Sequence, residues 1–372
     1  MIQIPAMDLA PAREELRAEL DAAADRVHAR AWYVLGDEVE GFEREFADAC
    51  EATSAVGVAS GLDALQLILR ADGIGPGDEV VVPAYTAVAT WMAVSLVGAT
   101  PVGADVDPVT YNVDPAAVEA AITERTRSIL PVHLFGRLAP MEALGKVAER
   151  HGLLLHEDAA QAHGAGRAGN RAGSLARAAG FSFYPVKNLG AFGDGGAVTT
   201  GDGELADRIR LLRTYGWRRR GQSEIKGLNS RLDELQAAWL RVKLRRLEAW
   251  NDRRAAIARR YLDAFEDLAD LELPPRDGLH EAAWHQFVLG SPERDALGAG
   301  LQERGVQTLV HYEPLPHLTA AYRADGHAPG EFPIAERLAS RALSLPMYPH
   351  LTDAQVDAVI AAVVDVSSPP AR

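Results

Sequence analysis

Three short segments of the chain carry residues whose types and order suit phosphate binding and imine formation. The first, Ser60-Gly61-Leu62-Asp63, follows an apolar run and opens a helical pattern. In the second, Asp158 comes shortly after a run of three leucines. In the third, Lys187 stands between an apolar run and a glycine-rich stretch.

The turn at Ser60 and Gly61 is a candidate anion site. The first N–H groups of a helix have no partner inside the helix, and the helix dipole favours negative charge there. Gly61 also lets a ligand approach the backbone closely. An ordinary strand-to-helix turn with Ser60 as its N-cap explains the same residues equally well. The motif alone therefore leaves both interpretations open.

Asp158 and Lys187 each have a functional and a structural interpretation. A carboxylate at the end of a buried strand needs a cation, and for Asp158 a structural arginine fits as well as a protonated ring nitrogen. The sequence has no HExxH pattern and no Cys/His spacing typical of a metal site. Partial burial and a nearby cation lower the pKa of a lysine, which favours the neutral amine that forms an imine. A lysine that extends to solvent is the competing interpretation of Lys187.

Considered together, the three segments contain the parts that hold pyridoxal 5'-phosphate (PLP). In this hypothesis the helix start and Ser182 bind the phosphate. Asp158 keeps the pyridine nitrogen protonated, and Lys187 forms the Schiff base.

Longer motifs around these residues resemble the DegT/DnrJ/EryC1/StrS sugar aminotransferases, in order and over nearly the whole chain. They are Ser60–Leu65, Glu157–Gly164, Phe181–Gly190 and Asn229–Ala237. The resemblance implies the aspartate-aminotransferase (type I PLP) fold and a homodimer with shared active sites. It also implies a ping-pong reaction in which an amino donor, expected to be glutamate, aminates a nucleotide-linked keto-sugar.

The resemblance also implies roles for individual residues. Lys187 is the Schiff-base lysine and the general acid and base, Asp158 pairs with the pyridine nitrogen, and Gln161 lies near the cofactor's hydroxyl. Phosphate binding falls to four residues, of which the last reaches in from the partner subunit: Gly61, Leu62, Ser182 and Asn229.

Tyr184, Arg218 and His311 are candidate substrate-binding residues. Arg218 belongs to the basic, glycine-flanked segment Trp217–Arg220, where a guanidinium suits a diphosphate. A solvated basic loop explains the segment equally well. His311 suits a sugar hydroxyl and ordinary packing equally.

Within the family, four segments resemble the branch that aminates C3 of dTDP-3-keto-6-deoxyhexoses: Gly61–Leu65, Val132–Gly136, Trp284-His285 and His311-Tyr312. Two departures leave the sugar open. Ala87 stands where family members commonly have an aromatic that stacks on the cofactor, with Tyr85 as a candidate replacement. Trp217–Arg220 replaces that branch's Ser-Arg-x-Lys-Tyr-like segment.

Three alternatives remain beside a C3 aminotransferase. One is an aminotransferase for a 4-keto-sugar or a keto-cyclitol. The second is a PLP-dependent sugar dehydrase, although that type has histidine at the position of Lys187. The third is a non-catalytic regulator with the same fold.

Composition restricts the partners and the compartment. The formal net charge of −14 over 372 residues argues against nucleic-acid binding, which needs a basic surface. The one cysteine, Cys50, excludes a disulfide within the chain. Met1–Pro11 does not resemble a signal peptide, and no apolar stretch approaches the ~20 residues of a membrane span. A soluble, cytoplasmic protein is expected.

The residues above require a sheet that positions them. Several apolar runs do not alternate with polar residues, which is typical of strands covered on both faces. The sequence therefore predicts an α/β fold in which a mostly parallel sheet lies between helices, with ligands beyond the carboxyl ends of the strands. The expected strands are 55–59, 80–83, 101–106, 128–133, 153–157, 180–183 and 196–199.

Near Arg231 the alternation of short apolar runs and helical patterns ends. A charged helical pattern over about 231–265 predicts one long connecting helix, and Pro274-Pro275 then breaks the chain. We expect a large PLP-binding domain over residues 1–245 and a smaller α+β C-terminal domain over residues 246–372.

Overall fold

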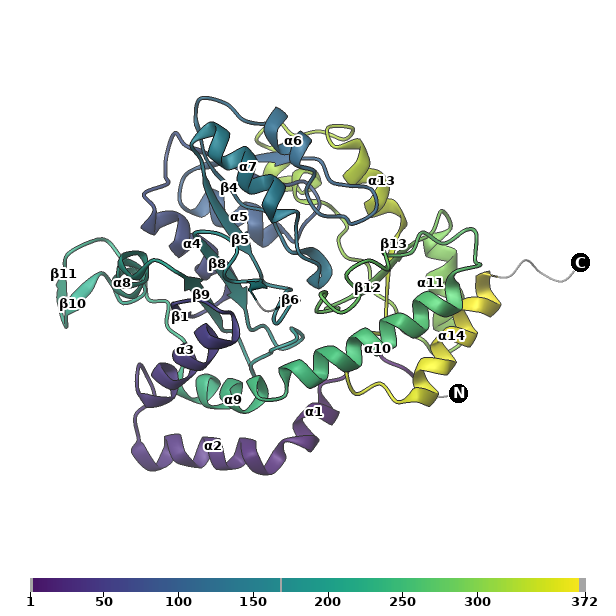
Figure 1. The fold of residues 1–372 in the computed structure, drawn as a ribbon, viewed down its shortest axis with the longest axis horizontal. Coiled ribbons are helices and arrows are strands. Elements are labelled where there is room, and N and C mark those ends of the chain that lie inside the picture. The colour runs from purple at the N-terminus through teal and green to yellow at the C-terminus, as the bar shows by residue number, and fades with distance from the viewer. Residues whose placement is uncertain (1–2, 168, 368–372) are drawn as a thin grey trace, which may run out of the picture.

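The computed structural model describes residues 3–167 and 169–367. Its centre is a seven-stranded sheet flanked by helices (Figure 1). The strands, in sheet order, are β1 (Ser54–Val58), β9 (Gly196–Thr200), β8 (Ala178–Ser182), β5 (Leu154–Asp158), β4 (Thr126–Ile129), β2 (Glu79–Pro83) and β3 (Thr100–Ala104). Neighbours from β8 to β3 pair in parallel, whereas β9 runs antiparallel to both β8 and β1. Six strands therefore point the same way.

All seven expected strands are present, and β4 differs most from its expected bounds. It ends at Ile129 and not at His133. Beyond that point Pro131 accepts a hydrogen bond from the Asp158 amide at 2.9 Å, and Val132 forms an isolated bridge with Asp158. Every residue of β2 is buried, which explains its unbroken run of valines.

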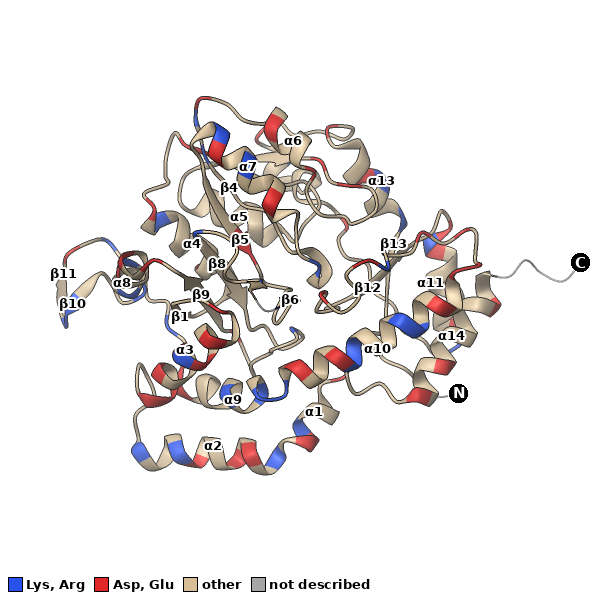
Figure 2. Ribbon diagram, in the orientation of Figure 1, with Lys and Arg blue, Asp and Glu red and all other residues tan. Residues whose placement is uncertain are grey.

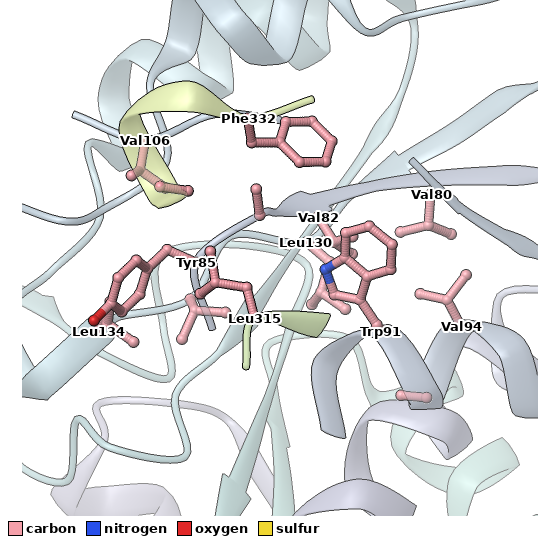
Figure 3. Close-up of a cluster of buried hydrophobic side chains, with 14 of the residues drawn as sticks. Val80, Val82, Tyr85, Trp91, Val94, Val106, Leu130, Leu134, Leu315 and Phe332 are labelled. Carbon is pink, nitrogen blue, oxygen red and sulfur yellow. The ribbon is translucent and has the colours of Figure 1, made fainter. Parts of the chain in front are cut away.

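The hydrophobic core extends from the sheet into the C-terminal part of the chain. Figure 3 shows Val80 and Val82 of β2 in one cluster with Trp91, Leu315 and Phe332. A second cluster lies among the C-terminal elements and includes α10, β12, β13 and α14. The first cluster joins residues from both sides of position 245, so the expected division there stays a prediction.

The expectation of one long helix over about 231–265 is wrong. Two helices occupy this segment, α9 (Glu234–Leu244) and α10 (Leu247–Phe265). At the break the amide of Arg246 bonds to the carbonyl of Lys243, three residues back and not four. Both arginines of the break, Arg245 and Arg246, also reach Glu19 of α2 (Arg17–Arg30), at 3.1 and 2.9 Å. The turn between the helices is thus tightened and anchored from outside.

The C-terminal part combines a small sheet with helices, as expected. The antiparallel strands β12 (Phe287–Gly290) and β13 (Ala342–Leu345) pair with each other. The helices around them are α11 (Arg294–Glu303), α13 (Pro333–Arg341) and α14 (Asp353–Ser367). Within residues 3–167 and 169–367, no helix is both long and apolar enough to cross a membrane.

Candidate active site

Residues capable of chemistry meet at one edge of the sheet. Asp158 ends β5 and Ser182 ends β8, while Gly61 begins α4 (Gly61–Ala71) three residues after β1 ends. Because β1, β5 and β8 point the same way, their carboxyl ends lie at the same edge. Figure 2 shows the sheet largely in tan, with acidic residues on β5. The structure thus brings three of the predicted segments to the edge where ligands of such sheets bind.

The start of α4 lies against the end of β8. A Cβ placed on Gly61 would lie 2.6 Å from the Cβ of Ser182 and 3.0 Å from its Cα, so the approach requires glycine. Ser60 is the N-cap of α4, and its hydroxyl accepts a hydrogen bond from the Asp63 amide at 3.1 Å. The cap leaves the N–H groups of Gly61 and Leu62 without an intrahelical acceptor. Both interpretations of this turn, helix cap and anion site, are therefore compatible with its geometry.

Lys187 lies in the loop between β8 and β9 and is half-buried. Burial lowers the pKa of Lys187 to about 8, although the negative charge of Asp158 acts in the opposite direction. A lysine that simply extended to solvent would keep an ammonium pKa near ~10.4. The structure therefore gives Lys187 an accessible neutral form near neutral pH, as imine formation requires.

Neighbouring elements hold the Lys187 loop on both sides. The side chain of Asn188 donates to the carbonyl of Ala283 at 2.6 Å and to the side chain of Asn251 at 2.9 Å. On the other side Lys243 of α9 donates to the carbonyl of Gly190 at 2.6 Å. Because its backbone is fixed in this way, Lys187 has little freedom except in its own side chain.

Asp158 is 4% exposed and has two hydrogen-bond donors. Thr90 of α5 (Val88–Leu96) donates to Oδ2 at 2.8 Å, and the Ala160 amide donates to Oδ1 at 3.2 Å. Burial raises the pKa of Asp158, while both hydrogen bonds and the charge of Lys187 act to lower it. Among the described residues, the groups that act on the Asp158 carboxylate are Thr90, the Ala160 amide, Lys187 and His133, and none is an arginine. The structural-arginine interpretation is therefore not supported.

Gln161 is 3% exposed and connects two elements of the site. Its Oε1 accepts the Phe135 amide at 2.6 Å, and its Nε2 donates to the hydroxyl of Tyr312 at 2.6 Å. Gln161 thus fixes Tyr312 near Asp158, whose charge contributes to raising the pKa of the tyrosine after burial.

His311 also lies within electrostatic reach of Lys187. Burial, and then the positive charge of Lys187, lower the pKa of His311 to about 4. Its Nδ1 is 2.8 Å from the hydroxyl of Ser344, and its carbonyl accepts a hydrogen bond from Tyr85 at 2.6 Å. The imidazole is therefore neutral at physiological pH and is oriented by β13.

The structure of one chain does not bring every predicted residue to Lys187. Tyr184 is 53% exposed. Arg218 lies on β10 (Trp217–Arg219), which forms with β11 (Gln222–Ser223) a hairpin that projects away from the sheet (Figure 1). There it pairs with Glu224 at 3.0 Å. Asn229 is exposed, and its backbone forms a bridge with Thr214. Roles for these three residues stay predictions.

Tyr85 belongs to the hydrophobic core (Figure 3). Its ring packs edge-on against Tyr111, with centroids 5.2 Å apart, and against Phe135 at 6.3 Å. Ala87 is the residue before α5 and adds no ring of its own.

Sequence reasoning missed Thr90, although it contacts Asp158 directly. A signal was present, because Thr86 just before the helix and Thr90 in its first turn are four residues apart, a spacing at which side chains can meet. Their side chains are each 1% exposed. Polar residues buried to this degree need polar partners.

Comparison with known proteins identifies the family. The model of the DegT/DnrJ/EryC1/StrS aminotransferase family matches residues 14–364. A dTDP-3-amino-3,4,6-trideoxy-alpha-D-glucose transaminase from Streptomyces venezuelae is 53% identical over 361 residues, covering 97% of this chain and 95% of the relative. The chain therefore belongs to the DegT/DnrJ/EryC1/StrS aminotransferase family.

Solved structures agree with this assignment. S. venezuelae DesV in complex with a ketimine intermediate is 51% identical, with a TM-score of 0.96 over 99% of this chain and 100% of DesV. Bacillus subtilis NtdA with bound cofactor PMP is 30% identical, with a TM-score of 0.92 over 99% of this chain and 86% of NtdA. These findings confirm the family resemblance, the aspartate-aminotransferase fold and the expectation that the protein is an aminotransferase.

Proposed function

We propose that the protein uses PLP to aminate C3 of a dTDP-linked 3-keto-6-deoxysugar, with glutamate as the amino donor. The observation that carries the proposal is the pairing of Lys187, whose pKa is lowered to about 8, with the buried carboxylate of Asp158. Asp158 ends β5, and Lys187 follows β8, whose last residue Ser182 lies against the start of α4. The ketimine complex of the related DesV supports Schiff-base chemistry in this fold.

The residues at the sheet edge fit PLP. The N–H groups of Gly61 and Leu62 and the hydroxyl of Ser182 suit the phosphate, because a helix start favours an anion. Asp158 suits a protonated ring nitrogen, and Gln161 supplies an amide near the cofactor's hydroxyl. When bound, PLP supplies an electron sink for the charge that develops as the donor loses a proton.

Lys187 carries the proton in the proposed reaction. Its Nζ would take the proton from the donor's Cα, which requires the neutral amine, and would hold that proton until it is given back. With a pKa of about 8, both protonation states are populated near neutral pH. The neutral imidazole of His311 and the hydroxyl of Tyr312 are candidates to bind sugar hydroxyls, since neither adds a charge to the site.

The sugar and the position of amination are inferred from the similar proteins. The relative from S. venezuelae acts on a dTDP-linked 3-amino sugar, as its name states, and this favours C3 over C4. The branch motifs Val132–Gly136 and His311-Tyr312 point the same way. Lys187 itself argues against a dehydrase, in which histidine is expected at this position.

A homodimer with shared sites completes the proposal. Several large apolar side chains are exposed on a single chain, and contact with a partner would remove them from water. They include Trp32, Tyr33, Val34, Val88, Met92, Leu96 and Phe192. Asn229 is exposed and thus free to reach a partner's phosphate, and the projecting hairpin would carry Arg218 to the same place.

A substrate panel tests the proposal. The protein is incubated with PLP, glutamate and one keto substrate at a time: a dTDP-3-keto-6-deoxyhexose, a dTDP-4-keto-6-deoxyhexose, their UDP counterparts and a keto-cyclitol. Mass spectrometry measures the amino product and 2-oxoglutarate. We expect the dTDP-3-keto sugar to be aminated with the highest kcat/KM. A preference for a 4-keto sugar or a cyclitol would assign the alternative substrate, and retention of PLP without any turnover would favour a regulator.

A further inference from the structure

Two buried threonines form a chain of hydroxyl groups that ends on Asp158. Thr86 lies just before α5, and Thr90 lies in its first turn. Their Oγ1 atoms are 2.9 Å apart, and Oγ1 of Thr90 is 2.8 Å from Oδ2 of Asp158. Thr86 and Thr90 are each 1% exposed, so water does not compete for these bonds.

The two hydrogen bonds of this hydroxyl series donate in one direction, toward Asp158. An ionised carboxylate only accepts hydrogen bonds, so Thr90 donates its hydroxyl proton to Asp158. Because the one hydroxyl proton of Thr90 is donated to Asp158, Thr90 must accept in its bond with Thr86, and Thr86 is the donor. Hydroxyls aligned in this way polarise one another and strengthen the last bond, which is to a charged group.

Helix capping does not account for these hydroxyls. The residue at the N-cap of α5 is Ala87, and no side chain caps this helix. A threonine within a helix usually bonds to a carbonyl one turn back, whereas the Oγ1 of Thr90 bonds to two side chains. Thr90 lies in the first turn of α5 and contacts Asp158, and the start of a helix favours a nearby anion.

Asp158 needs this support because it is buried. Burial raises its pKa, and the hydrogen bond from the Thr90 hydroxyl acts most strongly against this effect. Without the hydroxyl, the Ala160 amide at 3.2 Å would be the remaining donor to the carboxylate. A carboxylate with one donor in a buried site takes up a proton more readily, and a protonated Asp158 no longer stabilises a positive charge.

We propose that Thr90, supported by Thr86, is a positioning residue that keeps Asp158 ionised and aimed at the ring nitrogen of the cofactor. This inference rests on the proposed function, in which Asp158 is the partner of that nitrogen. Thr90 itself touches neither substrate nor cofactor in this role. Thr90 acts on cofactor binding through the Asp158 carboxylate, so its effect requires a cofactor that has a ring nitrogen.

The test compares binding of PLP with binding of 1-deaza-PLP, which has carbon in place of the ring nitrogen. The apo-protein is titrated with each compound, and the ratio of the two Kd values measures the contribution of the nitrogen. Thr90→Val removes the hydroxyl at nearly constant volume, and Thr90→Ser keeps it. Thr86→Val removes only the distant link. Thr199→Val is the matched control, because Thr199 is also buried and donates to a backbone carbonyl, that of Gly173, at 2.8 Å.

Wild type should prefer PLP over 1-deaza-PLP. We expect Thr90→Val to reduce this preference about tenfold, the order of magnitude for loss of one hydrogen bond to a charged group. Thr86→Val should reduce it less, while Thr90→Ser and Thr199→Val should keep it. An unchanged Kd for 1-deaza-PLP in Thr90→Val shows that the site is still folded.

Two negative results have different meanings. If wild type binds both compounds equally, Asp158 is not the partner of the ring nitrogen and the proposed function loses this assignment. If wild type prefers PLP but Thr90→Val and Thr86→Val keep the full preference, the role of the threonines alone is overturned. If Thr90→Val does not fold, Thr86→Val decides the question in the same assay.

Discussion

Gly61 and Ser182 approach so closely that a methyl group on Gly61 would meet the Cβ of Ser182 at 2.6 Å. Gly61→Ala must therefore push the start of α4 away from the end of β8. Since both segments are proposed to bind the same phosphate, we predict that the Kd for PLP rises on the order of tenfold, as expected for loss of one hydrogen bond to a charged group. Fluorescence titration of the apo-protein measures this change.

Gly203→Ala is the matched control for this substitution. Gly203 is also the first residue of a helix, α8 (Gly203–Leu212), and follows the capping residue Asp202. A Cβ at Gly203 meets nothing within 4 Å, so PLP affinity should not change. If Gly61→Ala binds PLP as tightly as Gly203→Ala does, the phosphate lies elsewhere.

Lys187→Ala should remove both the covalent attachment of PLP and all turnover. Borohydride reduction followed by peptide mass spectrometry should locate the cofactor on Lys187 in wild type and on no lysine in the variant. Lys146→Ala is the control, because Lys146 is exposed on α7 (Met141–His151) and pairs there with Glu142. A reduced lysine adduct that persists in Lys187→Ala would show that another lysine carries PLP.

The pKa of Lys187 predicts how reconstitution depends on pH. Only the neutral amine attacks PLP, so the rate should rise with pH and level off above the pKa of about 8. An ordinary lysine would still be gaining reactivity near pH ~10. The carboxylate of Asp158 raises the pKa of Lys187, so Asp158→Asn should move the midpoint to lower pH. Stopped-flow absorbance measures both midpoints, and a midpoint that rises in Asp158→Asn contradicts the electrostatic pairing.

Asp158→Ala should impair proton transfer more than PLP retention. The electron sink needs a protonated ring nitrogen, whereas most contacts to the phosphate remain. We therefore expect kcat to fall by much more than tenfold while bound PLP stays detectable by absorbance. If activity stays within about tenfold of wild type, or ~1.4 kcal/mol in barrier height, Asp158 is not the ring partner.

Mixing two inactive or weakened variants tests the shared sites. Lys187→Ala and Asn229→Ala subunits, allowed to exchange, should form heterodimers in which one site is unmutated. PLP affinity at that site should exceed that of the Asn229→Ala homodimer. The exchange itself is verified by native mass spectrometry. A fully active monomer, or no recovery of affinity after verified exchange, would mean that each site is built from one chain.

The sequence predicted the sheet well because buried parallel strands leave a clear signal. Leu153–Leu155 and the valines of β2 are continuous apolar runs, and the structure places β5 at the middle of the sheet and β2, which is buried throughout, beside the edge strand β3. The prediction of one long helix over about 231–265 was wrong because the break has no signal in the local sequence. Nothing in the helical pattern shows that Arg245 and Arg246 turn toward Glu19 of another helix, because that contact joins residues more than 220 positions apart.

The sequence predicted those site residues whose type and local context are unusual in themselves. A lysine beside an apolar run and a carboxylate at a strand end are unusual in themselves, and the structure brings Lys187 and Asp158 together. Thr90 was not found, since a threonine in an apolar helix has many ordinary explanations. Its role depends on β5 lying beside α5, which only the folded chain shows.

The pairing of β1 with β9 has a consequence for how the chain is made. Among the described strands, β1 lies at one edge of the central sheet and pairs with β9, and Val58 pairs with Gly196 nearly 140 residues later. During synthesis the apolar strand around Val56 therefore leaves the ribosome long before its partner exists. Until Gly196–Thr200 emerges, that strand is an open edge able to pair with other chains, so slow translation before Gly196 should increase aggregation.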